Sequence, residues 1–164
     1  MMGHTHGLIG AALGTGLGAA FHFQPEASLV LAAVGGFMAL VPDIDHPRAP
    51  LRRKLGLVGN VALGGLKHRG ITHTLLALVA IAAGAFTILP LPYALAATGG
   101  YLSHLLADMV TVSGLPVFWP YKRDSLHILP KRLCITTNTW PEWLLAAVLS
   151  MLILTQFPHF LGVK

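Results

Sequence analysis

Histidine and aspartate residues gather in four short clusters of this 164-residue sequence. The clusters occupy residues 3–7, 41–47, 68–73 and 103–108. Imidazole and carboxylate ligands without cysteine suit divalent ions such as Zn²⁺, Mn²⁺ or Fe²⁺. Eight candidate groups exceed what one tetrahedral zinc takes, so we predict two divalent ions, with Zn²⁺ as the first choice and Mn²⁺ or Fe²⁺ as alternatives. The candidate ligands are His6, Asp43, Asp45, His46, His68, His73, His104 and Asp108, and His4 competes with His6.

The spacing within the clusters predicts which ligands share an ion. His104 and Asp108 are four residues apart and would lie on one face of a helix. Asp43 and His46 would do the same if their helix continues to Pro47. Asp45 would then point elsewhere, toward a second ion or as a bridging carboxylate.

The third cluster needs a turn, because His68 and His73 are five residues apart and do not share a regular helix face. Gly70 allows that turn, and Thr72 is the predicted N-cap of the helix that follows. We therefore expect His68 to approach the site from the preceding loop.

A two-metal centre of this kind can hold a phosphoryl oxygen and supply a hydroxide nucleophile near neutral pH. We predict metal-dependent hydrolysis of a phosphoester, with Asp45 or His46 accepting the proton. Arg69 could hold the phosphate through its bidentate guanidinium, or it could serve only as a basic membrane anchor.

Five apolar segments must position these groups, at about residues 4–23, 26–41, 72–89, 93–112 and 141–157. The sequence is 54% hydrophobic and only 10% charged, whereas soluble domains carry about 25% charged residues. This excludes an ordinary soluble enzyme and predicts one all-α membrane domain over residues 1–164, with about five transmembrane helices and no cleaved signal peptide. The single cysteine, Cys134, excludes an internal disulfide framework.

The basic residues predict the orientation. All of them except Lys164 fall in two polar stretches, at about residues 42–71 and 113–140. The positive-inside rule places both stretches and the N-terminus in the cytoplasm, so we expect no nucleic-acid partner despite the net charge of +5. In this topology all four clusters lie at the cytoplasmic ends of their helices.

Small residues predict close packing of the first helix. Gly10, Gly14 and Gly18 recur every four residues and let another helix approach closely. The partner is either another helix of this chain or a second copy in a homo-oligomer.

The motifs together resemble the YdjM-like family of LexA-regulated, membrane-bound metal-dependent hydrolases. The resemblance rests on Thr5-His6 with Gly10 and on residues 41–47, 68–75, 100–109 and 114–120. It implies a multi-pass protein of a bacterial inner membrane with hydrolase activity.

The expected depth of the site limits the substrate. A site at headgroup level, surrounded by basic residues, favours a membrane lipid or a similar anionic amphiphile. Two alternatives stay open: a divalent metal transporter, and a non-catalytic membrane module stabilised by metal.

Overall fold

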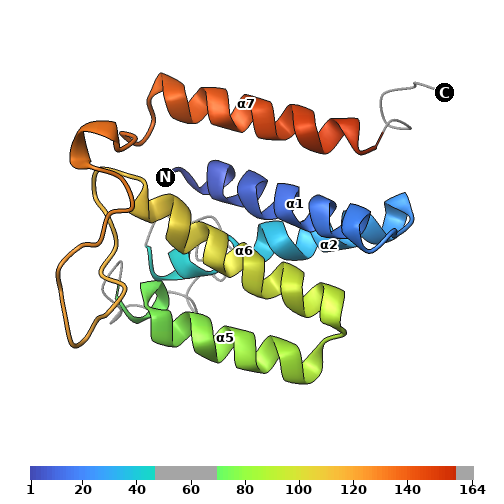
Figure 1. Cartoon of the computed structure of the whole chain (residues 1–164), viewed down its shortest axis with the longest axis horizontal. Coiled ribbons are helices and arrows are strands. Elements are labelled where there is room, and N and C mark those ends of the chain that lie inside the picture. The colour runs from blue at the N-terminus through green and yellow to red at the C-terminus, as the bar shows by residue number, and fades with distance from the viewer. Residues whose placement is uncertain (47–69, 158–164) are drawn as a thin grey trace.

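The computed structural model describes residues 1–46 and 70–157, and these form an all-helical bundle (Figure 1). The predicted all-α class with five main helices is confirmed, and the described residues contain two isolated β-bridges but no strand. His68 and Arg69 lie outside the described residues. The helices are α1 (Gly3–Ala20), α2 (Pro25–Met38), α5 (Leu75–Ile88), α6 (Leu91–Met109) and α7 (Trp140–Thr155), with short 3₁₀ helices η1 (Pro42–Asp45), η2 (Ile71–His73) and η3 (Lys131–Leu133).

Two predicted helix boundaries are wrong. The α-helix of the second segment ends at Met38, and Pro42 begins the separate 3₁₀ helix η1, so no α-helix continues to Pro47. Thr72 lies inside η2, and the N-cap of α5 is Thr74, whose hydroxyl accepts a hydrogen bond from the Ala77 amide at 3.1 Å. Two threonines at this spacing compete for the capping role, and the extended backbone of Thr74 makes it the cap.

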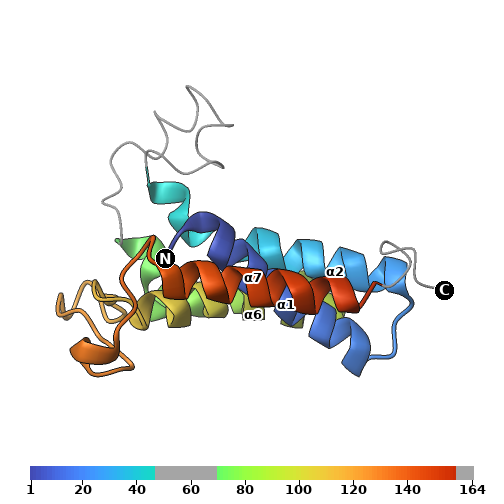
Figure 2. The ribbon, with the colours of Figure 1, turned by 90° about the horizontal axis from the view of Figure 1, so that it is seen from above.

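Close packing of α1, α2 and α6 forms the centre of the bundle (Figures 1 and 2). The glycine stripe of α1 lies on α2, where a Cβ on Gly14 would collide with the Leu31 carbonyl. Gly35 of α2 lies between the other two helices: a Cβ on Gly10 or on Gly100 would collide with its carbonyl oxygen. The predicted close approach is therefore made within this chain, at three helices rather than two.

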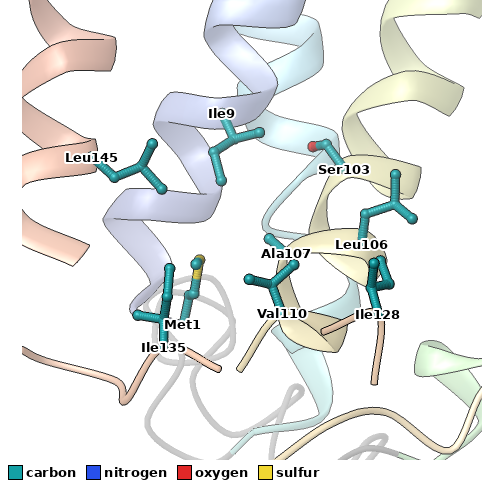
Figure 3. A pocket seen from close by; sticks show the side chains of 9 residues that line it. All are labelled: Met1, Ile9, Ser103, Leu106, Ala107, Val110, Ile128, Ile135 and Leu145. Atoms are coloured by element: carbon teal, nitrogen blue, oxygen red, sulfur yellow. The ribbon is translucent and has the colours of Figure 1, made fainter. Parts of the chain in front are cut away.

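The outer helices α5 and α7 flank this centre. α5 packs along α6 and has no buried residue, and α7 packs along α1 (Figure 1). Between α1, α6 and α7 lies an apolar cavity of about 330 Å³ (Figure 3). The outward faces of both outer helices carry large apolar side chains, among them Leu76, Ile88 and Met151.

Length and hydropathy identify one helical stretch of the described residues, Pro25–Asp45, as sufficient to cross a membrane. Two further helices, Leu75–Ile88 and Trp140–Thr155, are apolar but shorter. At 1.5 Å per residue, a helix of their length spans roughly 21–24 Å, less than the ~30 Å hydrocarbon core of a typical bilayer.

Candidate metal centre

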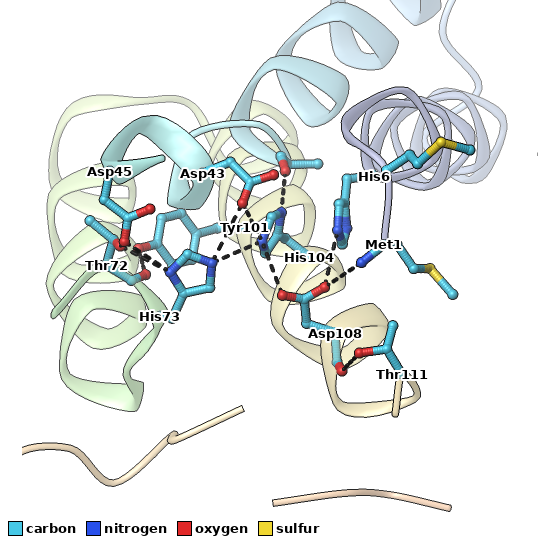
Figure 4. Close-up of polar contacts among 12 residues, drawn as sticks. Met1, His6, Asp43, Asp45, Thr72, His73, Tyr101, His104, Asp108 and Thr111 are labelled. Carbon is cyan, nitrogen blue, oxygen red and sulfur yellow. Dashed lines mark hydrogen bonds and ion pairs between the residues drawn. The ribbon is translucent and has the colours of Figure 1, made fainter. Parts of the chain in front are cut away.

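Six of the predicted ligands meet at one end of the bundle, although they come from four segments far apart in the sequence (Figure 4). The start of α1, the η1 and η2 turns, and the second half of α6 all lie at this end. The common level expected from the sequence is therefore present among the described residues. The six are His6 from α1, Asp43 and Asp45 from η1, His73 from η2, and His104 and Asp108 from α6.

Two groups of three residues have ligand atoms close enough to share an ion. The first is His6, Asp43 and His104, and the second is His73, His104 and Asp108. In each group the ligand atoms lie within 4.8 Å of one another. Because His104 belongs to both groups, the two arrangements overlap around its ring.

The hydrogen bonding of His104 leaves its Nε2 atom available as a ligand. Its Nδ1 atom lies 2.7 Å from the carbonyl oxygen of Ala39, which can only accept a hydrogen bond. The proton of a neutral ring therefore sits on Nδ1, and the Nε2 lone pair points into the cluster. A backbone carbonyl that fixes the ring in this way is typical of metal-ligating histidines.

His73 is oriented in a similar manner from the opposite side. Its Nδ1 atom lies 3.0 Å from the Thr72 hydroxyl and 3.5 Å from Oδ2 of Asp45. Its Nε2 atom lies 3.3 Å from Nε2 of His104 and 3.7 Å from Oδ1 of Asp43. Two imidazole nitrogens at this distance can share a proton in a hydrogen bond, and beside a carboxylate they can instead bind a metal ion.

Charge balance at His73 supports this. Burial disfavours its charged form, but hydrogen bonds to the carboxylates of Asp43 and Asp45 outweigh burial and raise the pKa of His73 above its ordinary value. The environment of the ring thus favours a positive charge at this position.

Asp108 connects the centre to the start of the chain. Its Oδ1 atom lies 3.2 Å from Nε2 of His6 and 2.8 Å from the amino nitrogen of Met1. The Nδ1 atom of buried His6 has no hydrogen-bond partner among the described residues. Such a nitrogen is costly to bury, so a ligand role for the His6 ring would satisfy an atom that the fold leaves unpaired.

One carboxylate gives access to the centre. The Asp43 side chain is 22% exposed, whereas those of His6, His73, His104 and Asp108 are at most 3% exposed. A small ion would therefore reach the cluster from the η1 side.

Other histidines differ in their surroundings. His4 is exposed and its ring lies 5.0 Å from that of Trp143, so the geometry favours His6 over His4 as the ligand. His46 follows η1 as its C-cap and belongs to neither group of three. His68 and Arg69 fall in the part of the chain that the structure does not describe.

The sequence did not reveal the roles of three polar residues, two beside the candidate ligands and one at the start of α7. Thr72 donates its hydroxyl proton to Asp45 at 2.8 Å, and the Tyr101 hydroxyl donates to the carbonyl of Thr72. Fully buried Glu142 accepts hydrogen bonds from the amides of Met2 at 2.5 Å and Asn138 at 2.7 Å. An acidic residue directly after Pro141 is a signal of a helix start, and it could have indicated that Glu142 faces a backbone rather than solvent.

Comparison with known proteins identifies relatives of this chain. The chain is 34% identical to "Inner membrane protein YdjM" of Escherichia coli (strain K12) over 139 residues, covering 76% of this chain and 67% of that protein. It is 31% identical to "Uncharacterized protein YvsG" of Bacillus subtilis (strain 168) over 153 residues, covering 92% of this chain and 91% of that one. No solved structure matches. The model of one family, described as YdjM inner membrane protein, matches residues 1–161, and the chain therefore belongs to the YdjM inner membrane protein family.

Proposed function

We propose that this membrane protein is a metal-dependent hydrolase that acts on a phosphoester of a membrane-level substrate. The observation that carries the proposal is the pair of ligand groups that share His104 at one end of the bundle. The free Nε2 atom of His104 can bind only one ion, so a second ion close to the first would be held through a bridging carboxylate, with Asp43 and Asp108 as the candidates.

The donor set fits divalent metal. Neutral imidazole nitrogens, carboxylates and no thiolate favour Zn²⁺, with Mn²⁺ or Fe²⁺ as alternatives. His6, Asp43, His73, His104 and Asp108 would hold the ions. When bound, the ions would act as Lewis acids on a phosphoryl oxygen and lower the pKa of water.

The remaining polar residues have supporting roles. The carboxylate of Asp45 accepts from Thr72 and contacts His73, so we assign it the positioning of the His73 ring rather than proton transfer. Proton acceptance then falls to His46, directly after η1 and partly exposed. Arg69 stays the predicted phosphate-binding group.

The substrate follows from the surroundings of the centre. The long connection between α6 and α7 presents four exposed basic residues: Lys122, Arg123, Lys131 and Arg132. With the outward apolar faces of α5 and α7 in a bilayer, these residues would lie at headgroup level and attract an anionic lipid or lipid-like molecule. We propose a multi-pass arrangement in the inner membrane with this end and the N-terminus in the cytoplasm.

A metal count combined with a hydrolysis assay tests the proposal. Protein purified without chelator should contain about two divalent ions per chain by mass spectrometry. It should hydrolyse a phospholipid or isoprenoid phosphate in detergent, lose activity with chelator and regain it with Zn²⁺ or Mn²⁺. Asp108→Asn should remove metal and activity together because it replaces a ligand carboxylate with a neutral amide.

The matched control is Asp124→Asn, which changes an exposed aspartate of the α6–α7 connection and should preserve both metal and activity. A metal content near zero in wild-type protein would refute the centre. Metal-loaded protein that moves divalent ions across liposomes, yet hydrolyses no phosphoester, would replace the hydrolase proposal with a transporter.

A further inference from the structure

The apolar cavity between α1, α6 and α7 has a volume of about 330 Å³ (Figure 3). Eight of its nine lining side chains are apolar. The ninth, Ser103, donates its hydroxyl proton to the Gly100 carbonyl at 2.7 Å within its own helix. The cavity thus offers hydrocarbon surface without a competing side-chain hydrogen bond, and its volume is in the range of small ligand sites.

The cavity extends from the metal-centre end of the bundle toward its middle. Three lining residues, Ile9, Ser103 and Leu145, lie on three different helices. Each is roughly 7–9 Å, at 1.5 Å per residue, from the end of its helix on the side of the metal centre. A ligand that fills this space would be elongated along the bundle axis.

One end of the cavity lies beside the candidate metal centre. Met1 lines the cavity, and its amino nitrogen lies 2.8 Å from Oδ1 of Asp108. Along α6, the lining residues Ser103 and Ala107 directly precede His104 and Asp108 of the centre. An elongated ligand would therefore have its polar end beside the centre and its apolar end deeper in the bundle.

Positive charge lies close in the chain to two residues that line the cavity. Ile128 and Ile135 line the cavity from the connection between α6 and α7, and the 3₁₀ helix η3 lies between them in the chain. η3 carries Lys131 and Arg132, and both side chains are exposed. Two cations at this position complement an anionic headgroup.

We propose that the cavity binds one acyl chain of an anionic membrane lipid, with the headgroup beside η3 and the metal centre. As a substrate-binding site the cavity rests on the proposed hydrolase function, because it would align the lipid phosphate with the ions. Chain binding itself depends only on the apolar lining and the flanking charge, so it can be tested without metal.

Photo-crosslinking of the full-length protein tests this binding. The protein is placed in phosphatidylcholine vesicles that contain phosphatidylglycerol with a diazirine on one acyl chain, and labelled residues are mapped by mass spectrometry. Ile9 and Leu145 should be labelled at least threefold more than Val79, an exposed residue on α5. This preference should persist in chelator. If the labelling preference persists but metal-loaded protein hydrolyses no phosphoester, the hydrolase proposal is wrong and acyl-chain binding still holds.

Two tryptophan variants on one face of α6 provide the matched comparison. Leu106 lines the cavity and is 44% exposed, whereas Leu102, one turn earlier, is 38% exposed and does not line it. Leu106→Trp should fill the cavity and lower labelling of Ile9 and Leu145 at least threefold, and Leu102→Trp should leave it unchanged.

The headgroup is tested with the same diazirine chain on phosphatidylcholine, which should label the cavity at least threefold less than phosphatidylglycerol. Equal labelling by both lipids would overturn the anionic headgroup. Labelling spread evenly over α5 and the cavity, or insensitive to Leu106→Trp, would overturn the acyl-chain site.

Discussion

The hydroxyl of Thr72 joins a carboxylate and an imidazole of the candidate metal centre. It donates to Asp45 at 2.8 Å and lies 3.0 Å from Nδ1 of His73, while the Tyr101 hydroxyl donates to its carbonyl. These contacts hold the His73 ring with its Nε2 atom toward His104. A single threonine outside the ligand set therefore orients a ligand.

Thr72→Val keeps the shape of the side chain and removes this hydroxyl. We expect Zn²⁺ affinity to fall about 10-fold, at the lower end of what the loss of an outer hydrogen bond to a ligand costs. Titration of chelated protein with Zn²⁺ against a competing indicator measures this change.

The matched control for this substitution is Thr98→Val on α6. The Thr98 hydroxyl oxygen is buried without a hydrogen-bond partner in the described part of the chain, so its removal should not lower Zn²⁺ affinity. Equal affinity in wild type and Thr72→Val would show that the hydroxyl does not orient His73.

Among the elements, α2 determines how closely its neighbours approach. Gly35 contacts α1 on one side and α6 on the other, and its carbonyl lies where a Cβ on Gly10 or Gly100 would be. The ends of these three helices, with η1 after α2, carry most of the candidate ligands. The spacing of the helices at Gly35 thus sets the distances within the centre.

Gly35→Ala should therefore loosen the bundle. Its Cβ would collide with the Gly10 carbonyl, a backbone group that cannot move aside as a side-chain end can. We expect a loss of about 1–3 kcal/mol in the free energy of unfolding, typical of overpacking, and weaker Zn²⁺ binding. Denaturant titration in detergent micelles measures the first quantity and indicator competition the second.

Gly16→Ala on α1 is the control, because a Cβ there meets no atom within 4 Å. Its stability should equal or slightly exceed that of wild type, since alanine is the better helix former. A wild-type-like Gly35→Ala would contradict close packing at this crossing.

At the scale of the whole molecule, the polar groups are separated from the apolar ones along the bundle axis. The candidate ligands and the exposed basic residues of the α6–α7 connection lie toward one end. The α1–α2 turn, with Gln24, lies at the other end (Figure 1). This polarity supports the proposed orientation in the membrane.

Cysteine labelling of intact cells tests that orientation. In a Cys134→Ser background, Arg123→Cys should react with a membrane-impermeant maleimide only after the inner membrane is opened. Gln24→Cys should react before it is opened. Both residues are exposed, so a difference in labelling reports the side of the membrane and not burial. The opposite pattern would show that the topology is reversed. Labelling of both cysteines from one side would show that residues 24 and 123 lie on the same side of the membrane.

The sequence by itself determined the class of fold and the types of ligand. Apolar segments of helical length are a local property, so they predicted five helices in an all-α bundle, now confirmed. The spacing of His104 and Asp108 is likewise local, and both residues occur on α6 in one of the groups of three. The glycine interval of α1 predicted close packing but not its partner.

Only the tertiary structure decided how the ligands are paired. The rotation of α1 about its axis turns His6, rather than His4, toward the other candidate ligands. The turn at Pro42 and the rotation of α6 place His104, rather than His46, beside Asp43. Thr72, Tyr101 and Ala39 enter the centre through contacts between segments 27 to 65 residues apart. Hydrophobic periodicity was weak on these nearly uniform apolar helices. Their orientation was set instead by glycine contacts with neighbouring backbones, which depend on all three helices at once.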